Sequence, residues 1–418
     1  MRTSPTAVMK TGRSRAAAAL CLNNQMISEK EALQQILGAV NALPSRRLPL
    51  VQATNCFAAQ DYVAQTALPN FDNSAMDGYA VIANDCRPGA RLKVTGEQPA
   101  GRDRRLSITS GHAIRIFTGA PLPAGSDAVV MQEEVQANGA EITISTDVEP
   151  GEFVRRRGCD VAVGQKILGK GERVRDVTIG VLAAQGFSEI AIGGEAKVAI
   201  ISTGSELVEP GNALEPGQIY DSNSSLLRAL VNAIGGEVTM AKHCLDEEKS
   251  LIAALKQASE NDVLLVSGGV SAGQHDLVKS ALAEIGAAID LWRVAVKPGK
   301  PFLFGRLGRC WIFGLPGNPV SSFVTFLKFV RPAVLKMMGA SDQELALRRV
   351  RARLTEDVMG DERRPHYIRG RLVEGDFRPI GRQESHAVFG LSKSNALLRV
   401  AAGAAAKAGD LVTVEIWD

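Results

Sequence analysis

The sequence predicts an α/β protein of several domains: a β-rich first half, a doubly wound βα domain and a small C-terminal β barrel. Three observations support this fold class. The chain has 418 residues, and since a typical domain has about 150 residues, about three domains are expected. Hydrophobic residues make up 45% and charged residues 22% of the chain, as is usual for folded globular proteins. The apolar pattern also changes twice along the chain, from short isolated runs to alternating strands and helices and back.

The first elements are a helix and a β-rich region. The apolar run 16–22 is at the short limit for a signal peptide and no secretory disulfide pattern follows, so we expect residues 1–25 to be a disordered extension. From Ser28, with Glu31 three residues later and apolar residues at helical spacing, the pattern predicts a capped helix. Between residues 48 and 193, runs at 79–82, 113–117, 128–131 and 141–145 are separated by Gly, Pro and Asn, which predicts a largely β region.

From residue 197 onward, apolar strands alternate with helical stretches, which is typical of a parallel, doubly wound sheet. The predicted strands are 198–202, 238–244, 263–266, 291–296 and 310–313. The predicted helices are 226–234, 249–258, 277–285 and 320–338. After residue 339, runs at 350–354, 367–372, 396–400 and 411–416 are divided by turns and predict a closing β barrel.

Charge and cysteine content limit the possible partners. The 48 basic and 45 acidic residues give a formal charge of +3, too small to indicate a nucleic acid as partner. No apolar run approaches the roughly 20 residues of a membrane helix, so no membrane partner is expected. The six cysteines lie far apart without a C-x-x-C pair, which favours a reducing compartment, and we expect the cytoplasm.

Three segments that follow predicted strands carry residues suited to binding an anion, since ligands of open parallel sheets bind beyond the carboxyl ends of the strands. They are S-T-G-S-E-L at 202–207, S-G-G-V-S-A-G at 267–273 and G-L-P-G-N-P-V-S at 314–321. The glycines at 268 and 269 allow backbone N–H groups to point at one anion, which suits a phosphate or a pterin. A plain turn remains the alternative for each segment taken alone.

Lysines and carboxylates are expected at the same edge. Lys297 and Lys300 belong to the stiff turn K-P-G-K-P at 297–301, which is suited to holding an oxyanion. Asp246 and Asp276 flank other predicted strands, and carboxylates beside a phosphate site favour Mg²⁺, although a helix cap is the alternative role for either. The phosphate loop of NTPases, the G-x-S-x-G elbow, H-E-x-x-H and G-x-G-x-x-G are all missing.

Six motifs in order resemble the MoeA family, the molybdopterin molybdenumtransferases that include the E domain of gephyrin. They are F-D-N-S-A-M-D-G-Y-A at 71–80, T-G-A-P at 118–121, R-R-R-G at 155–158, S-G-G-V-S at 267–271, K-P-G-K-P at 297–301 and G-L-P-G-N-P at 314–319. The resemblance implies insertion of molybdate into adenylylated molybdopterin with Mg²⁺-dependent release of AMP. It also implies a molybdopterin adenylyltransferase as the preceding enzyme of the pathway.

The resemblance further implies domain boundaries and a homodimer. The N-terminal helix and linker domain would comprise 26–62 and 165–195, with an inserted β domain at 63–164. The molybdopterin-binding βα domain would span 196–344 and the C-terminal β barrel 345–418. In the expected dimer the inserted domain of one subunit faces the βα domain of the other, so the active site would be shared.

The same resemblance assigns roles to individual residues. Catalytic roles fall to Asp77, Glu206, Asp246, Asp276, Lys297 and Lys300, with Asp246 and Asp276 as the metal ligands. Cofactor-binding positions are Thr118, Arg155, Asp160, Thr203, Ser267, Gly268, Gly269, Ser271, Pro316, Asn318 and Pro319. Molybdate would be bound by Lys297, Lys300, Arg369 and Ser385. Whether Glu206 or Asp77 orients the attacking oxygen stays open.

The sequence departs from the family pattern at Cys159, Ser205, Arg293 and 274–275, and Arg in place of Lys at 293 keeps the charge but not the shape of the side chain. Two other functions are considered. A receptor-clustering scaffold of the gephyrin type is disfavoured because the chain has no long disordered linker and no second fused catalytic domain. A molybdopterin adenylyltransferase is disfavoured because that enzyme resembles the βα domain alone.

Overall fold

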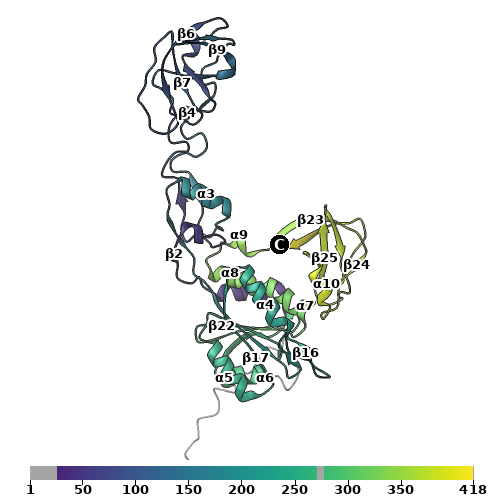
Figure 1. Ribbon diagram of the computed structural model, residues 1–418. Helices are drawn as coiled ribbons and strands as arrows, with labels where there is room; N and C mark the ends of the chain where they lie inside the picture. The colour runs from purple at the N-terminus through teal and green to yellow at the C-terminus, as the bar shows by residue number, and fades with distance from the viewer. Residues whose placement is uncertain (1–25, 271–276, 418) are drawn as a thin grey trace, which may run out of the picture.

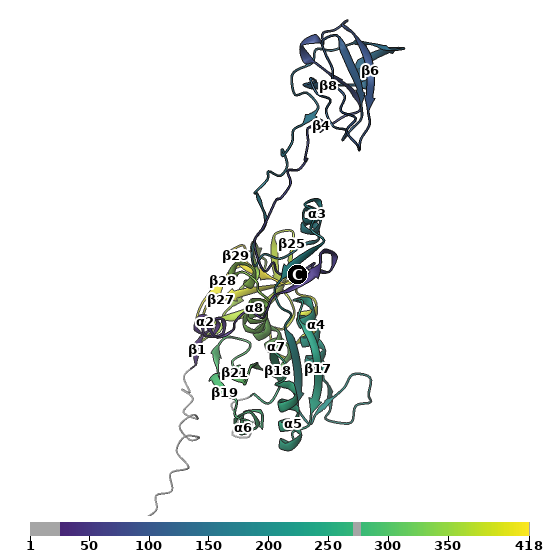
Figure 2. The same cartoon turned by 90° about the vertical axis from the view of Figure 1, so that its left-hand side faces the viewer.

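The computed structural model describes residues 26–270 and 277–417. The predicted extension 1–25 and two predicted site residues, Ser271 and Asp276, lie outside the described residues. The molecule is elongated: one β domain stands at the far end of a two-segment connection, away from a body that contains the α/β sheet and the barrel (Figures 1 and 2). The expected combination of an α/β domain with separate β domains is therefore confirmed.

The N-terminal helix begins and ends close to where the sequence predicts. Helix α2 (Glu29–Ala39) follows β1 (Ile27–Ser28), and Ser28 and Glu31 form a capping box at its start. The chain then runs out through β2 (Arg46–Pro49), η1 (Leu50–Gln52) and β3 (Tyr62–Val63), and returns through β12 (Lys166–Leu168), α3 (Asp176–Ala184) and β13 (Glu189–Ile192). Because β3 pairs with β12 and β2 with β13, the outgoing and returning segments form one linker unit.

The distal β domain contains a six-stranded sheet. In spatial order its strands are β8 (Ala128–Met131), β5 (Gly78–Val81), β7 (His112–Ile116), β6 (Arg91–Gln98), β10 (Glu141–Ile144) and β9 (Val135–Asn138). The short strands β4 (Asn73–Ser74) and β11 (Val154–Arg155) pair beside it, and η2 (Ala83–Asp85) and η3 (Gln132–Glu134) complete the domain. All four strands predicted in this region are present.

The second sheet also has six strands and lies in the body of the molecule. Its order is β17 (Glu237–Cys244), β14 (Lys197–Thr203), β18 (Val263–Ser267), β22 (Cys310–Leu315), β21 (Leu303–Leu307) and β19 (Ala288–Leu291). The first four strands are parallel, whereas β21 and β19 are antiparallel to their neighbours. In β14, Val198 and Ile200 pack into one core, while Ala199 and Ile201 pack into another. Both faces of the strand are thus covered, which explains its continuous apolar run.

Helices cover both faces of this sheet. One core receives α4 (Ser222–Ala233), α7 (Pro319–Thr325), η4 (Phe326–Val330) and α8 (Arg331–Met337), and the other receives α5 (Glu248–Ala258) and α6 (Leu277–Glu284). The short pairs β15 (Leu207–Val208) and β16 (Ile219–Tyr220), and helix α9 (Asp342–Leu345), lie at the periphery of the fold. Among the described residues, none of the helices is both long and apolar enough to cross a membrane.

Two details of the predicted α/β domain were wrong. The strand predicted at 291–296 is divided, because β19 ends at Leu291 and β20 (Val294–Ala295) pairs instead with β1. Its apolar residues enter one core, so the run looks continuous in the sequence. Strand β21 was missed, because Gly305 interrupts its apolar pattern. A Cβ at that position would lie 2.4 Å from the Ala288 carbonyl oxygen of the adjacent strand, so the close approach requires glycine.

The helix predicted at 320–338 is helical throughout but has three parts. Between α7 and α8 lies the π-helical segment η4. Pro332, near the start of α8, has no N–H to donate to the preceding turn. A π segment changes the register of the helix at this point without ending it.

The C-terminal region forms a closed barrel, as predicted. Its strands, in order, are β23 (Arg348–Leu354), β26 (Asp376–Pro379), β25 (His366–Val373), β27 (Ala396–Val400) and β29 (Leu411–Ile416). The pair β24 (Val358–Met359) and β28 (Ala405–Ala406), with helix α10 (Val388–Ser392), completes it. Strand β26 was missed because its sequence D-F-R-P contains residues that are rare in strands.

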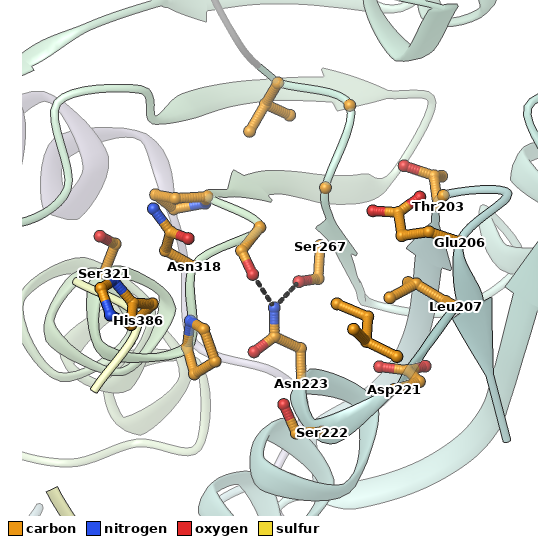
Figure 3. Close-up of a pocket in the computed structure, with 18 of the residues that line it drawn as sticks. Thr203, Glu206, Leu207, Asp221, Ser222, Asn223, Ser267, Asn318, Ser321 and His386 are labelled. Carbon is orange, nitrogen blue, oxygen red and sulfur yellow. Dashed lines mark hydrogen bonds between the residues drawn. The ribbon is translucent and has the colours of Figure 1, made fainter. Parts of the chain in front are cut away.

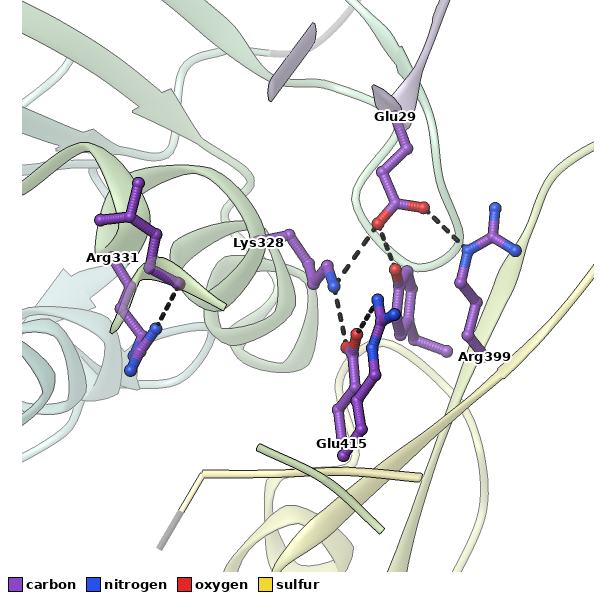
Figure 4. Close-up of polar contacts among 8 residues, drawn as sticks. Glu29, Lys328, Arg331, Arg399 and Glu415 are labelled. Atoms are coloured by element: carbon purple, nitrogen blue, oxygen red, sulfur yellow. Dashed lines mark hydrogen bonds and ion pairs between the residues drawn. The ribbon is translucent and has the colours of Figure 1, made fainter. Parts of the chain in front are cut away.

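Buried charges join helix α2, segment η4 and the barrel (Figure 4). The Nζ of Lys328 lies 2.8 Å from Glu415 Oε2 and 3.6 Å from Glu29 Oε1, and the three side chains are at most 14% exposed. Arg399 Nε lies 3.0 Å from Glu29 Oε2, and the Tyr367 hydroxyl donates to the same carboxylate. Burial raises the pKa of Glu29, but Lys328, Tyr367 and Arg399 outweigh it and leave the pKa lowered. The network holds the barrel against the helices of the α/β domain.

Candidate active site

A cavity of about 830 Å³ lies at the carboxyl ends of β14, β18 and β22 (Figure 3). All three segments that the sequence analysis selected contribute to its lining. The predicted site residues in this lining are Thr203, Glu206, Asp246, Ser267, Gly268, Gly269, Pro316, Asn318 and Pro319. Since β14, β18 and β22 are adjacent and parallel, segments separated by more than 100 residues meet at one edge.

The loop after β18 depends on two glycines in the left-handed region. Gly268 has φ +89° and Gly269 has φ +61°. A Cβ on Gly268 would lie 2.5 Å from the Thr203 carbonyl oxygen, and one on Gly269 would lie 2.5 Å from Val278 Cγ2. The prediction that the Gly268 N–H points at an anion was wrong, because it donates to the Leu315 carbonyl at 3.2 Å. These glycines bring the loop against β14 and β22.

The start of helix α4 contributes residues that the sequence analysis missed. Asp221 caps the helix, accepting from the Ser224 N–H at 3.0 Å and from the buried Ser202 hydroxyl at 2.6 Å. Asn223, 7% exposed, lies in the first turn and lines the cavity. The helix was predicted to begin only at residue 226. The available signal was Asp221 with Ser224 three residues later, which is a common helix start.

The barrel also reaches the cavity. Asn318 Nδ2 donates to Ser385 Oγ at 2.9 Å, and the Val320 N–H donates to the Ser385 carbonyl at 3.1 Å. The next residue, His386, lines the cavity, and its Nε2 lies 3.3 Å from Glu384 Oε2. The sequence analysis selected Ser385 from the family resemblance but did not select His386.

Two of the carboxylates at the cavity, Glu206 and Asp246, are exposed. Asp246 accepts from the N–H and hydroxyl of Ser205, at 3.2 and 3.3 Å, and Glu206 lies in the adjoining turn. Carboxylate and hydroxyl oxygens are the ligands that Mg²⁺ prefers. Across residues 26–270 and 277–417, no three His, Cys, Asp or Glu side chains are arranged to hold a metal ion.

The predicted molybdate-binding cations lie beside the cavity rather than in its lining. Lys297 Nζ lies 3.3 Å from Asp361 Oδ2, and Lys300 is exposed next to the lining residue Pro301. The Arg363 N–H, with Lys297 and Arg364, lowers the pKa of Asp361 to about 2 against the opposing effect of burial. 

Arg369, in β25, is buried at 1% exposure and lies beside Gly390 of α10. Its guanidinium donates to the Arg382 carbonyl. It therefore does not line the cavity in this arrangement.

Four predicted residues lie in or beside the distal β domain. Asp77 accepts from the Thr118 N–H at 2.8 Å and from its hydroxyl at 2.9 Å, and these hydrogen bonds lower the pKa of Asp77. Arg155, in β11, and Asp160 are exposed nearby. Within one chain, the β domain stands away from the α/β sheet whose strand ends line the cavity (Figures 1 and 2).

Comparison with known families matches three consecutive parts of this architecture. The MoeA N-terminal region (domain I and II) matches residues 27–186, and the MoeA C-terminal region (domain IV) matches residues 351–417. Between them, residues 199–336, which contain the cavity's sheet, match a probable molybdopterin binding domain. The chain belongs to the MoeA family.

Relatives of this MoeA protein match over nearly its whole length. A molybdopterin molybdenumtransferase of Haemophilus influenzae is 37% identical over 384 residues, covering 88% of this chain and 93% of its own length. Molybdopterin molybdenumtransferase 2 of Mycobacterium tuberculosis is 35% identical over 406 residues, covering 94% of this chain and all of its own. The crystal structure of a molybdopterin biosynthesis MoeA protein from Pyrococcus horikoshii OT3 superposes with a TM-score of 0.82 at 31% identity, covering 94% and 100% of the two chains. The Haemophilus influenzae and Mycobacterium tuberculosis relatives carry the name of a transferase.

Proposed function

We propose that this MoeA protein is a molybdopterin molybdenumtransferase that inserts molybdate into adenylylated molybdopterin and releases AMP in a Mg²⁺-dependent reaction. The observation that carries this proposal is the convergence of three strand-end segments on one cavity. At about 830 Å³, the cavity is within the usual range for small-molecule sites, about 300–1,000 Å³. The names of the relatives support the transfer of molybdenum to molybdopterin.

The residues of the cavity suit a phosphorylated ligand. Thr203 and Ser267 supply hydroxyl groups, and the turn containing Gly268 and Gly269 brings them close together. We assign molybdopterin binding to this part of the cavity, together with the remaining predicted positions Pro316, Asn318 and Pro319. Ser271, also predicted to bind the cofactor, lies outside the described residues.

Mg²⁺ fits the oxygen-rich side of the cavity. Asp246 would hold the ion, and Asp276, the second predicted ligand, lies outside the described residues. When bound, Mg²⁺ neutralises charge on the pyrophosphate linkage and on the leaving AMP. Glu206 and Asp77 are the two candidates for orienting the attacking oxygen.

Molybdate is proposed to bind beside the cavity, where Lys297 and Lys300 offer positive charge to a dianion. Ser385 is bonded to Asn318 at the cavity's rim and completes this subsite. For Arg369 to take part, its side chain would have to leave its buried position, where it is now bonded to a backbone carbonyl. Arg369 is therefore the least supported member of the predicted molybdate group.

A homodimer with a shared active site is the second part of the proposal. Asp77, Thr118, Arg155 and Asp160 lie in or beside the distal β domain, which stands away from the α/β sheet of its own chain (Figure 1), so a two-fold partner is the natural source of these groups. The elongated connection, which holds the β domain away from the body of its own chain, supports this arrangement. Each of the two sites would then combine one α/β domain with the partner's β domain.

The preceding enzyme of the pathway and the cellular compartment are proposed from the same reaction. The enzyme would take its substrate from a molybdopterin adenylyltransferase, and the cytoplasm is the proposed compartment. A scaffold of the gephyrin type is the alternative, since that role would use the same domains without turnover. An adenylyltransferase is the other alternative, and it would consume ATP rather than release AMP from an adenylylated pterin.

One incubation tests the proposal. Purified protein is mixed with adenylylated molybdopterin, molybdate and Mg²⁺, and AMP and molybdenum cofactor are measured. We expect both products, with AMP release lost when Mg²⁺ is chelated. Binding of the pterin without AMP release would favour the scaffold, and formation of adenylylated molybdopterin from molybdopterin and ATP would favour the adenylyltransferase.

A further inference from the structure

Asn223 connects two of the loops that form the cavity. Its Nδ2 donates to Ser267 Oγ at 2.8 Å and to the Gly317 carbonyl oxygen at 2.7 Å (Figure 3). Ser267 ends β18, and Gly317 follows β22. With only 7% of its surface exposed, Asn223 is held in the first turn of α4 between these two strand ends.

The contacts determine which way the amide of Asn223 faces. A backbone carbonyl can only accept, so the group 2.7 Å from the Gly317 oxygen must be the NH₂ rather than the carbonyl oxygen of the side chain. The second hydrogen of the same NH₂ group is donated to Ser267 Oγ. Ser267 is thus an acceptor toward Asn223, and its own hydroxyl hydrogen remains available for another partner.

A second hydroxyl lies on the other side of the glycine turn. Thr203 is 6% exposed, and in the described part of the chain its buried Oγ1 has no hydrogen-bond partner. A Cβ on Gly268 or Gly269 would lie 3.1 or 2.9 Å from this oxygen, so Thr203 adjoins the turn directly. Buried hydroxyl groups are normally hydrogen-bonded, so an unpartnered one that lines a cavity indicates a ligand atom.

We propose that Asn223 is a positioning residue that makes the Ser267 hydroxyl a donor, so that Ser267 and Thr203 together bind the phosphate oxygens of the ligand. The inference rests on the proposed function for the phosphorylated nature of that ligand. Asn223 is the residue that sets the direction of the Ser267 hydrogen bond. Hydroxyl donors to an ionised phosphate form stronger hydrogen bonds than those between neutral groups.

A double-mutant cycle separates this role from a purely structural one. Inorganic pyrophosphate is titrated calorimetrically, without molybdate or pterin, into wild-type protein, Asn223→Ala, Ser267→Ala and the double variant. We expect each single variant to bind about tenfold more weakly, as for the loss of one hydrogen bond to a charged group. In the Ser267→Ala background, Asn223→Ala should add less than about threefold, because the effect of Asn223 is exerted through Ser267.

Two further variants control for folding. Asn232→Ala removes an exposed asparagine from the same helix and should leave pyrophosphate affinity unchanged. Asn223→Asp keeps the side-chain volume but offers an acceptor, so the Ser267 hydroxyl turns toward it and the added charge repels the anion. We expect this variant to bind pyrophosphate at least as weakly as Asn223→Ala, with an unaltered circular dichroism spectrum.

Two results would overturn the proposal. The first is that wild-type protein does not bind pyrophosphate. The second is that Asn223→Ala weakens pyrophosphate binding by the same factor whether or not the Ser267 hydroxyl is present. Neither result depends on catalytic turnover, so the role of Asn223 is tested separately from the proposed reaction. Wild-type protein that binds pyrophosphate with the expected cycle but releases no AMP from adenylylated molybdopterin would contradict the proposed function and leave the role of Asn223 intact.

Discussion

The α/β domain and the distal β domain present their predicted functional groups in different ways. In the α/β domain, Thr203, Ser267 and Asn318 belong to separate strand ends and line one cavity. In the β domain, Asp77 and Thr118 are bonded to each other but remain exposed. A parallel sheet edge collects distant residues within a single chain, whereas the β domain presents a preformed pair on its surface. The comparison leads directly to the proposed dimer.

The largest effect is expected from mixing subunits that are damaged in different domains. Asp77→Asn and Glu206→Gln homodimers should each retain less than about 1% of wild-type AMP release, because every site lacks one carboxylate. After subunit exchange at equal amounts, about half of the dimers are mixed, and one of the two sites in each contains both carboxylates. We therefore expect about a quarter of wild-type activity to return.

A matched mixture tests the arrangement further. Asp77→Asn and Thr118→Val both damage the β domain, so each site of their mixed dimer keeps one lesion and no activity should return. If the Asp77→Asn and Glu206→Gln mixture stays inactive after exchange is confirmed by mass spectrometry, the site is built within one chain and the shared-site proposal is wrong.

The two regions also differ in how they are attached to the rest of the molecule. The barrel is held to the α/β domain by buried ion pairs around Lys328 (Figure 4), whereas the β domain is reached through two extended segments. Lys328→Met should destabilise the body by about 3 kcal/mol, because Glu29 and Glu415 lose a buried cation while keeping arginine partners. Hydrogen exchange should become faster in α2 and the barrel and stay unchanged in β5 and β8.

The control for Lys328 is an exposed ion pair in the same barrel. Lys407 lies 2.7 Å from Asp357, with the two side chains 74% and 58% exposed. Lys407→Met should leave the free energy of unfolding close to that of the wild-type protein, because solvent screens an exposed ion pair. Equal effects of the two substitutions would show that the buried network does not hold the barrel in place.

The difference between the regions also explains what the sequence could predict. The ends of the strands predicted at 198–202, 263–266 and 310–313 could be placed to within two residues, because buried parallel strands are continuous apolar runs. The topology of the sheet then brings the following loops together. The role of Asn223 could not be predicted in this way, since it depends on the start of α4 packing between β18 and β22. Likewise, the Lys297 pair with Asp361 depends on how the barrel docks, which no local pattern determines.

Two glycines with similar backbone angles, one in each region, allow a finer comparison of the two regions. Gly268 has φ +89° and its added Cβ would lie 2.5 Å from the Thr203 carbonyl, whereas Gly119 has φ +80° and no atom within 4 Å. Gly119→Ala should lower stability by about 1 kcal/mol through backbone strain alone. Gly268→Ala must also displace Thr203, and we expect pyrophosphate affinity to fall about tenfold by calorimetry. Equal loss of affinity in both variants would contradict the assignment of the ligand to the α/β cavity.

The smallest effect concerns the charge available to molybdate. Lys297 is paired with Asp361, so Asp361→Asn should leave the ammonium group unpaired and lower the apparent KM for molybdate about two- to threefold, as expected for one partly exposed charge. Arg363→Ala is the control, because it removes a neighbouring side chain but keeps the backbone N–H that donates to Asp361.

The pH dependence of this last effect follows from the carboxyl group. The pKa of Asp361 is lowered to about 2, below its usual value of about 3.9. The stabilisation from the ion pair is therefore fully present above about pH 4 and is lost only as the pH falls toward 2. Between pH 6 and pH 8 the Asp361 carboxyl group stays ionised in wild-type protein. The decrease in the apparent KM for molybdate caused by Asp361→Asn should therefore be the same across this range. If the decrease in apparent KM disappears within this range, another titrating group, rather than Asp361, controls the positive charge that Lys297 offers to molybdate.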